Sequence, residues 1–294
     1  MYFPYQKNFP LAEILDWLKR EKVFVFLETT RADTQNRFSY IFTNPVDIIS
    51  CCRPSEIKEV FEQIEGYSKN DYYAAGFFSY EMGYAFENLY KTKKSYKFPL
   101  LWLGIFKSVI VFDHHLNKFL DNNYPPLKKT KQQSKYQINN LKLNVSQKSY
   151  LNSIKKIKEL IRQGDTYEVN YTMKYKFDFK GSPYQLYRDL RNRQSVSYSA
   201  FIKTEDFKIL SFSPELFFRK KERNIQTRPM KGTIGRGRNL REDALNKNRL
   251  KQDEKNRAEN LMIVDLFRND LGRVSETNSV KTKDIFCVEK YETL

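Results

Sequence analysis

The sequence predicts an α+β fold, in which helices alternate with groups of antiparallel strands. Residues 171–179 alternate strictly between apolar and polar side chains, which is typical of a half-buried strand with a period of two. Apolar residues recur at helical spacing between Ser146, a residue suited to cap a helix, and Gly164, a residue suited to end one. The apolar residues of this expected helix are Leu151, Ile154, Ile157 and Ile161. Strands follow one another elsewhere in the chain, which favours α+β over a doubly wound sheet.

The first part of the chain predicts one helix and several apolar strands. Residues 10–22 place four apolar residues on one helical face, with Asn8 in position to cap the helix. These four residues are Leu11, Ile14, Leu15 and Leu18. We expect a buried strand at 23–29, a strand with small residues that allow close approach of another element within 74–87, and a pair of apolar strands at 100–115.

The second part of the chain has a more regular pattern. Ser182 and Pro183 predict the start of a helix, because proline is favoured at the first helical position. Its inward residues are expected to be Leu186, Tyr187 and Leu190. Short strands are expected at 198–203, 207–213 and 215–220, and a charged helical region follows them.

The composition along the chain predicts three segments. Residues 1–118 form an N-terminal lobe, and residues 146–294 form a second region. Residues 119–145 are rich in polar residues and prolines, so we expect a linker or a surface excursion there.

The charge of the chain favours small anionic substrates. The 294 residues include 52 Lys and Arg against 35 Asp and Glu, a net charge of +17. These basic residues are spread along the sequence, whereas nucleic-acid-binding modules concentrate them on one element with aromatic partners. We therefore expect electrostatic steering of small anions and no nucleic-acid partner.

Other features exclude several classes of protein. No apolar run is long enough to span a membrane, and the start of the chain does not fit a signal peptide, so we expect a cytoplasmic protein without a membrane partner. Cys51, Cys52 and Cys287 do not have the spacing of a disulfide framework or of a zinc site. His114 and His115 are the only histidines, and we expect them at a strand end or a turn.

Three clusters in the second half carry candidate chemistry. In SFSPELFFR, Glu215 follows a proline at a strand junction. In TRPMKGTIGRGRN, Lys231 directly precedes Gly232 and Thr233. Each has a simple structural alternative: Glu215 caps a turn, Lys231 is solvated, and the glycines form a flexible loop. The glycine order fits neither a Walker motif nor a dinucleotide-binding fingerprint.

The third cluster is RAENLMIVDLFRNDLGRV, a mostly apolar helix that carries Glu259 and Asp265. Acidic side chains in an apolar setting require a compensating partner. That partner is either a basic residue such as Arg268 or a metal ion.

Taken together, these clusters resemble the chorismate-utilising enzymes. SFSPELF, RPMKGT followed by GRGRN, and RAENLMIVDLFRNDLGRV stand in the order and approximate spacing of that family. GDTYEVNYT and GFFSYEMGYAFE resemble further segments of it, so the resemblance runs from about residue 70 to the last residue. It implies an α/β/β/α sandwich with two orthogonally packed antiparallel sheets, and residues 146–294 would be the first part of the catalytic region that binds chorismate.

The resemblance also separates branches of the family. Anthranilate synthases carry alanine where this chain has Lys231, whereas aminodeoxychorismate synthases carry lysine in Pro-Ile-Lys-Gly-Thr. Isochorismate and salicylate synthases place a catalytic lysine at the position of Glu168, so those reactions are disfavoured. Glu168 also departs from the glutamine usual in the other branches, and its contact is left open.

The resemblance implies a role for each candidate residue. Lys231 would be the nucleophile that attacks chorismate, and Glu215 would be the general acid for the departing hydroxyl group. Glu259 would bind Mg²⁺, the expected cofactor. Gly232 and Thr233 would contact substrate oxygens. Asp265 would not contact the substrate and would have a structural role.

The implied reaction converts chorismate and ammonia to 4-amino-4-deoxychorismate for 4-aminobenzoate and folate synthesis. Ammonia would come from a glutamine amidotransferase subunit or from free ammonium. Anthranilate synthesis is the nearest alternative. The chain stops at YETL, where family members continue, so we expect a C-terminally truncated protein that is inactive alone. A non-catalytic remnant or binding protein is the alternative from another class.

Overall fold

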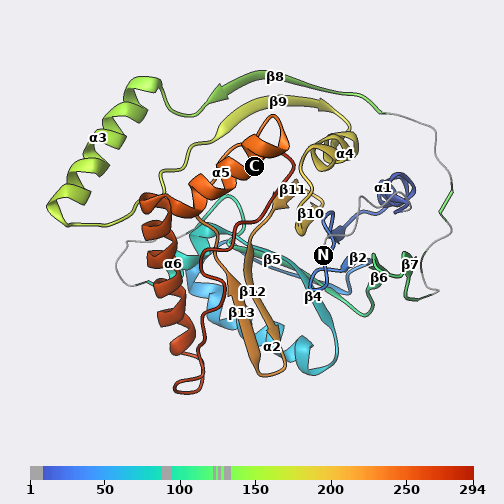
Figure 1. The fold of residues 1–294 in the computed structure, drawn as a ribbon. Coiled ribbons are helices and arrows are strands. Elements are labelled where there is room, and N and C mark those ends of the chain that lie inside the picture. The colour runs from blue at the N-terminus through green and yellow to red at the C-terminus, as the bar shows by residue number, and fades with distance from the viewer. Residues whose placement is uncertain (1–8, 88–94, 122–123, 125–126, 129–133) are drawn as a thin grey trace. The chain divides into compact units, whose positions relative to one another are not determined.

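The computed structural model describes residues 9–87, 95–121, 124, 127–128 and 134–294 (Figure 1). The chain forms two compact units, one drawn from residues 1–131 and 190–215 and the other from 132–189 and 216–294. We call these unit 1 and unit 2 and describe each by itself. The units interleave along the sequence, whereas the three predicted segments follow it in order. The predicted boundaries near residues 119 and 146 stay a prediction.

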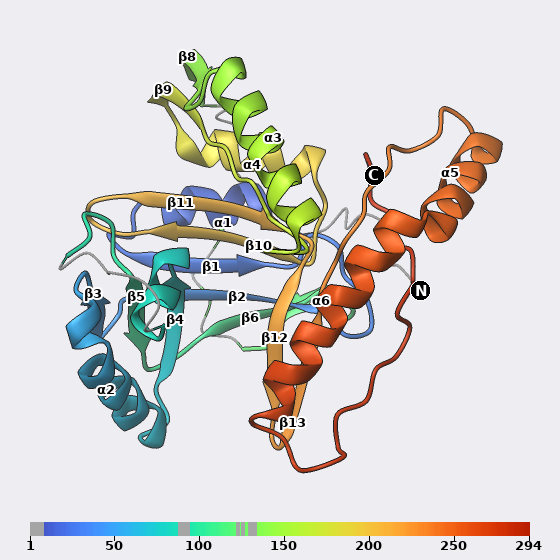
Figure 2. The ribbon, with the colours of Figure 1, turned by 90° about the vertical axis from the view of Figure 1, so that its left-hand side faces the viewer.

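A six-stranded antiparallel sheet forms the larger part of unit 1. Its strand order is β11-β10-β1-β2-β6-β7, and most of these strands lie side by side in Figure 2. The strands are β1 (Phe24–Glu28), β2 (Phe38–Thr43), β6 (Ile110–Asp113), β7 (Lys118–Phe119), β10 (Tyr198–Lys203) and β11 (Lys208–Ser213). Phe26 of β1 is paired with Phe201 of β10, so residues from both halves of the sequence share one sheet.

A second sheet of unit 1 has the order β3-β5-β4. It consists of β3 (Asp47–Cys51), β4 (Tyr73–Phe78) and β5 (Leu101–Phe106), and it is accompanied by η1 (Pro54–Glu56), α2 (Ile57–Lys69) and η2 (Tyr80–Ala85). One apolar cluster joins Ile57 and Val60 of α2 to this sheet. Another joins Trp102 of the sheet to Val25 and Phe42 of the six-stranded sheet. Both faces of β5 are therefore covered, and all its residues are buried.

Two strand predictions for unit 1 are refined by this topology. The strands expected within 100–115 form as β5 and β6, but the prediction that they pair is wrong, since each belongs to a different sheet. The close approach expected within 74–87 occurs at Gly76, where an added Cβ atom would lie 2.0 Å from the carbonyl oxygen of Trp102. A residue larger than glycine at position 76 would therefore push β4 and β5 apart.

The predicted N-terminal helix is present as α1 (Leu11–Leu18). Its buried residues are the four that the sequence pattern assigns to the inner face, Leu11, Ile14, Leu15 and Leu18. Burial of each such side chain contributes about 1.5–3 kcal/mol. Asn8, the expected cap, lies outside the described residues.

A buried polar network crosses the inside of unit 1. Arg191 donates from Nε to Glu28 Oε1 over 2.6 Å, and the two side chains are 9% and 0% exposed. His114 follows β6, as predicted for a strand end, and its Nε2 lies 2.6 Å from the hydroxyl oxygen of Ser39. Burial, helped by the nearby Arg191 charge, lowers the pKa of His114 to about 4. His114 is therefore neutral in the folded protein near pH 7.

The described residues of unit 2 form two separate two-stranded antiparallel sheets and four helices (Figure 1). The strands are β8 (Tyr136–Leu143), β9 (Tyr175–Gly181), β12 (Leu216–Lys221) and β13 (Asn224–Arg228). The helices are α3 (Gln147–Gln163), α4 (Pro183–Arg193), which ends in unit 1, α5 (Leu240–Gln252) and α6 (Glu254–Gly272). β8 lies inside the stretch 119–145 that is predicted to be a polar linker or surface excursion. It forms a strand there because its backbone pairs with β9.

Several local predictions for unit 2 are confirmed, but the predicted burial is wrong. The hydroxyl oxygen of Ser146 accepts a hydrogen bond from the Ser149 amide, and Gly164 ends α3 with a φ of 83°. No residue of α3 is buried, and every residue of β9 is exposed. β9 begins at Tyr175 and has one neighbouring strand, so its apolar side chains lack the cover that half-burial requires. In α4, Tyr187 is fully buried as predicted, whereas Leu190 is 39% exposed.

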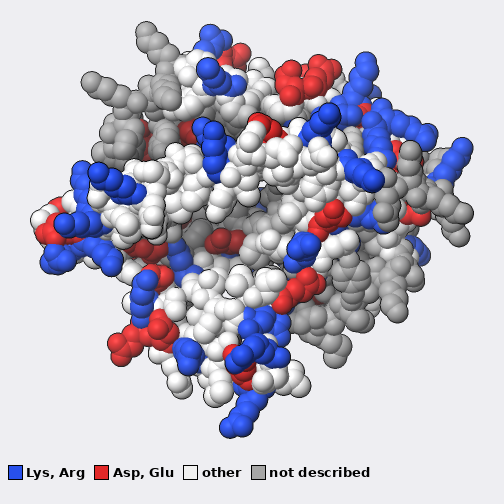
Figure 3. All heavy atoms as spheres, turned by 90° about the horizontal axis from the view of Figure 1, so that it is seen from above, with Lys and Arg blue, Asp and Glu red and all other residues white. Residues whose placement is uncertain are grey.

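The observed elements confirm the predicted α+β class with antiparallel sheets. Among the described residues, no helix has both the length and the apolar character needed to cross a membrane. Figure 3 shows basic side chains interspersed with acidic and other residues over the face that it displays. Their spacing on this face agrees with their spread along the sequence.

Candidate active site

Lys231 lies in a partly enclosed polar cluster of unit 2. Its Nζ donates to Glu168 Oε1 over 2.5 Å and to Asn170 Oδ1 over 3.3 Å. The Lys231 and Glu168 side chains are 18% and 15% exposed. The cluster brings residues 63 positions apart into contact, so the solvated-lysine interpretation does not describe this site.

The second carboxylate oxygen of Glu168 is unusual. Oε2 is buried and has no hydrogen-bond partner among the described residues, while Oε1 accepts from Lys231. A buried polar oxygen without a partner is costly, and a charged one is costlier still. The contact of Glu168 that the sequence leaves open is therefore an ion pair with the candidate nucleophile.

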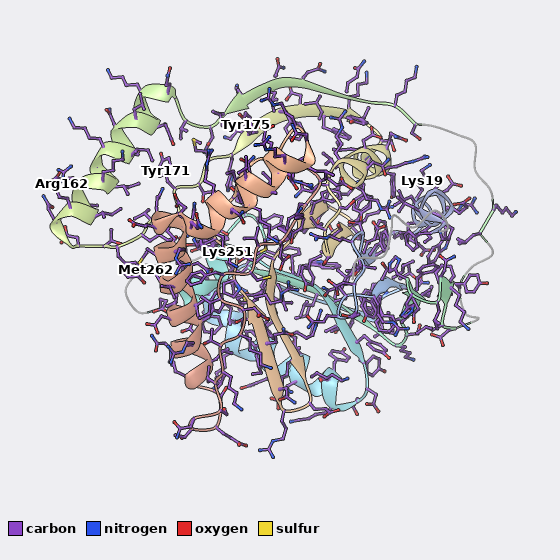
Figure 4. The ribbon with its side chains drawn as sticks, in the orientation of Figure 1. Lys19, Arg162, Tyr171, Tyr175, Lys251 and Met262 are labelled. Carbon is purple, nitrogen blue, oxygen red and sulfur yellow. The ribbon has the colours of Figure 1, made fainter. Side chains whose placement is uncertain are left out.

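The segment that carries Glu168 is held by hydrogen bonds on both sides. The Thr166 hydroxyl donates to the Glu168 carbonyl oxygen over 3.2 Å. The Tyr171 hydroxyl donates to the Ser153 hydroxyl of α3 over 3.2 Å. Figure 4 labels Tyr171 on the stretch between α3 and β9. These hydrogen bonds hold the segment on either side of Glu168.

Gly232 has two reasons to be glycine. Its φ is +76°, a left-handed conformation that other residues rarely adopt. An added Cβ atom would also lie 2.7 Å from the side-chain oxygen of Asn256 on α6. The loop after Lys231 is thus packed closely against the first turn of α6. Thr233, the next residue, is exposed.

Asp243 anchors the same loop at its other end, and sequence reasoning missed it. Its carboxylate accepts two hydrogen bonds from Arg236, of 2.6 and 3.0 Å, and one from Lys290 over 2.9 Å. It also accepts from the Gly237 amide over 3.2 Å. The hydrogen bonds from Arg236 and Lys290 hold the pKa of Asp243 well below its usual range. The loop that the sequence suggested to be flexible is held by ion pairs and hydrogen bonds to the buried carboxylate of Asp243.

A sequence signal for Asp243 does exist. Asn239 caps α5, with its side-chain oxygen accepting from the Glu242 amide over 2.9 Å. The cap places Glu242 and Asp243 in the first turn of the helix, where acidic residues are favoured. Asp243 therefore lies in the first helical turn shortly after Arg236 and Arg238 of the loop. This pattern indicates that its carboxylate holds the loop to the start of α5.

Glu215 lies in unit 1, directly before β12 begins in unit 2. It is exposed, and its backbone amide donates to the Ser213 hydroxyl over 3.1 Å. This turn contact fits the predicted strand junction. It assigns no chemical role to the carboxylate, so the role of Glu215 as a general acid stays a prediction.

Glu259 and Asp265 both lie on α6 and both have basic partners. Glu259 Oε1 is 3.6 Å from Nζ of Lys255, and the Glu259 side chain is 27% exposed. Asp265 is 65% exposed and pairs over 3.3 Å with Arg268, the partner named from the sequence. Neither Glu259 nor Asp265 therefore requires a metal ion for compensation.

The described residues do not form a complete magnesium site. They contain no group of three or more His, Cys, Asp or Glu side chains able to hold a metal ion. Glu259 supplies one carboxylate, and Mg²⁺ needs near-octahedral oxygen coordination. Water, substrate or residues outside the described part of the chain would have to supply the other ligands.

Comparison with known proteins shows which family this chain resembles. The family model described as chorismate binding enzyme matches residues 22–294. Aminodeoxychorismate synthase component 1 of Klebsiella aerogenes is 33% identical over 234 residues, covering 74% of this chain and 51% of the relative. Anthranilate synthase component 1 of Aquifex aeolicus is 40% identical over 152 residues, covering 52% of this chain and 31% of the relative.

The fold agrees with a solved structure of the same group. Anthranilate synthase component I from Streptococcus pneumoniae matches with a TM-score of 0.64 at 22% identity, over 85% of this chain and 65% of that one. This likeness confirms the fold that the sequence resemblance implied. The present chain spans about half the length of the curated relative from Klebsiella aerogenes. The match over residues 22–294 shows that the chain belongs to the chorismate binding enzyme family.

Proposed function

We propose that this chain supplies the chorismate-converting part of an aminodeoxychorismate synthase, the activity that turns chorismate and ammonia into 4-amino-4-deoxychorismate. The observation that carries this proposal is Lys231, which stands in RPMKGT with 18% of its side chain exposed. Relatives named aminodeoxychorismate synthase component 1 support the same assignment. Because the chain spans about half of such a relative, the activity is proposed for the whole protein.

Lys231 is the nucleophile of the proposed reaction. Its Nζ forms a bond to C2 of the chorismate ring while the bond between C4 and the hydroxyl oxygen breaks. Glu215 protonates the departing oxygen, which leaves as water. Ammonia then bonds to C4, and the bond between Nζ and C2 breaks with its electron pair returning to nitrogen. Two easier substitutions replace one difficult displacement.

The neighbouring residues bind and orient the substrate in this proposal. Gly232 and Thr233 contact substrate oxygens through a backbone amide and a hydroxyl group. Glu259 is the carboxylate assigned to Mg²⁺, an ion that supplies charge neutralisation for a substrate carboxylate when bound. No step above passes through the ion, since one carboxylate does not hold it alone. Asp265, paired with Arg268, has a structural role.

Partners and cellular location extend the proposal. A glutamine amidotransferase subunit supplies the ammonia, and the designation component 1 in the relatives' names agrees with a second component. The net charge of +17 favours encounter with the chorismate dianion. The product enters 4-aminobenzoate and folate synthesis in the cytoplasm.

Anthranilate synthesis is the second candidate function. It is supported by the relative from Aquifex aeolicus, which is named anthranilate synthase component 1 and is 40% identical over half of this chain. The two reactions start from the same substrate, but anthranilate formation also releases pyruvate. The lysine at position 231 favours the first candidate.

Intact-protein mass spectrometry tests the nucleophile directly. The whole protein is mixed with chorismate in the absence of ammonia, and we expect an adduct with the mass of chorismate less one water on Lys231. Lys231→Ala should form no adduct, whereas Lys155→Ala, which alters an exposed lysine of α3, should form it normally. A chain that binds chorismate but never forms the adduct would remove Lys231 from this role.

Product analysis then separates the two candidates. Chorismate, ammonium and Mg²⁺ are added, and the products are resolved by liquid chromatography. Aminodeoxychorismate without pyruvate supports the proposal, and anthranilate with pyruvate supports the second candidate. Glu259→Gln should raise the Mg²⁺ concentration needed for adduct formation, with Asp265→Asn as the matched control on α6. An unchanged Mg²⁺ titration would argue for a structural role of Glu259.

A further inference from the structure

We propose that Glu168 is the base that accepts the proton of Lys231 and so prepares its amine for attack. The inference rests on the proposed function, because it concerns the nucleophile of that reaction. Glu168 acts through Lys231 and is therefore a positioning residue for the chemistry at C2. None of the comparisons assigns it a role.

The geometry suits direct proton transfer. Nζ of Lys231 and Oε1 of Glu168 are 2.5 Å apart, within the reach required for a positioned base. Asn170 Oδ1, at 3.3 Å, holds the same nitrogen from another direction. Among the described residues, Lys231 is the basic residue that forms an ion pair with Glu168. The nearby Tyr171 hydroxyl is directed to Ser153 instead.

The step balances within the pair. The bond between Nζ and its hydrogen breaks, and a bond between Oε1 and that hydrogen forms. The electron pair of the broken bond stays on nitrogen as the lone pair that attacks C2. An ammonium and a carboxylate become a neutral amine and a neutral carboxylic acid, and no third reactant is needed.

The burial of Oε2 favours this transfer. A carboxylate shares its negative charge between both oxygens, yet Oε2 is buried and has no hydrogen-bond partner among the described residues. Protonation at Oε1 removes the charge from this buried oxygen and so relieves the cost of its burial. A glutamine at this position, as in most of the family that the sequence resembles, cannot accept a proton from an ammonium group.

Competitive acetylation across a pH series tests the transfer. The full chain is treated with trace acetic anhydride, which modifies neutral amines, and the labelled peptides are quantified by mass spectrometry. Exposed Lys155 provides an internal reference, and its rate should rise about tenfold per pH unit because only solvent can take its proton. Proton transfer between Lys231 and Glu168 involves no proton from solvent. The fraction of Lys231 with a neutral amine should therefore be nearly the same at every pH of the series.

The expected results are quantitative. Between about pH 6 and about pH 8, Lys231 acetylation should change less than about threefold in the unaltered chain, because the proton moves between the two partners and is not released to solvent. Glu168→Gln should restore a rise of about tenfold per pH unit, since only solvent can then take the proton. Asn170→Ala, the matched control, removes a neutral contact and should keep the flat profile.

Two outcomes would overturn the proposal. One is a slope of about tenfold per pH unit at Lys231 in the unaltered chain, a measurement that requires no variant to fold. The other is a flat profile that persists in Glu168→Gln. Acetylation needs no turnover, so failure of the proposed function would leave the profiles unchanged. Conversely, a steep profile at Lys231 would show that Glu168 is not its base. The role of Lys231 as nucleophile would still be tested separately by the chorismate adduct.

Discussion

The two units of this protein each contain a strand that the sequence predicts, and the two strands have opposite outcomes for burial. In unit 1, all six residues of β5 are buried because α2 packs on one side of its sheet and the six-stranded sheet on the other. In unit 2, all seven residues of β9 are exposed, although apolar and polar side chains alternate along it. The continuous apolar run of β5 and the period-two pattern of β9 both predict a strand, and burial depends on a covering element.

The comparison also concerns function. Within the described part of unit 2, the buried residues are Tyr187, Leu216 and Asp243. With so few buried apolar residues in this unit, the geometry of the cluster around Lys231 depends on hydrogen bonds and ion pairs. Polar networks of this kind depend on every partner being present.

The largest effect is expected from truncating the core of unit 1. Phe106→Ala empties a fully buried position of β5 and should lower the free energy of unfolding by about 3–5 kcal/mol. Phe177→Ala on β9, where the side chain is 44% exposed, should cost less than about 1 kcal/mol. Urea unfolding followed by circular dichroism measures both. Equal losses would contradict the contrast between the units.

A charge inside unit 1 should also be costly to remove. Glu28→Ala leaves the buried guanidinium of Arg191 without its carboxylate partner, and should lower stability by about 3–5 kcal/mol. The control is Glu159→Ala, which breaks an exposed ion pair with Arg162 on α3 and should cost less than about 1 kcal/mol. The same urea titration applies, and a small loss for Glu28→Ala would mean that water reaches Arg191.

His114 should make the stability of unit 1 depend on pH. Its pKa is about 4 in the folded protein, below the value of 6.5 for a free histidine, so between these values the unfolded chain binds the extra proton. Stability therefore rises with pH in this window, and the contribution is complete above about pH 6.5. We expect a loss of about 2–3 kcal/mol on lowering the pH from about 7 to about 4.

Unfolding curves measured at several pH values check this expectation. His114→Gln should flatten the profile between pH 4 and 6.5, while His115→Gln, its exposed neighbour, should leave it unchanged. A profile that is equally steep in both variants would assign the pH dependence to other groups.

The smallest effect should be local to the loop after Lys231. Asp243→Asn weakens the hydrogen bonds from Arg236, Lys290 and the Gly237 amide, which is 3.2 Å from the carboxylate. Hydrogen exchange at the Gly237 amide should accelerate, with little change in β5. Asp265→Asn, an exposed acid of the same unit, is the control. Unchanged exchange at Gly237 would show that the loop is held by other contacts.

The sequence by itself determined the local elements of this protein and its family. The inner face of α1, the Ser146 cap and the Gly164 end of α3 depend on residues within a few positions of one another, so short-range chemistry decides them. The three motifs around Glu215, Lys231 and Glu259 likewise carry the family resemblance in contiguous residues, and the match over residues 22–294 bears it out.

Only the tertiary structure decided which segments meet. It separates β5 from β6 and pairs β1 with β10, because strand partners depend on how whole sheets close. It leaves β9 uncovered, since burial belongs to the packing of layers and periodicity alone does not specify it. It also joins Glu168 to Lys231 and Asp243 to Lys290. Hydrogen bonds between side chains require positions within about 3 Å, and only the folded chain brings such distant residues that close.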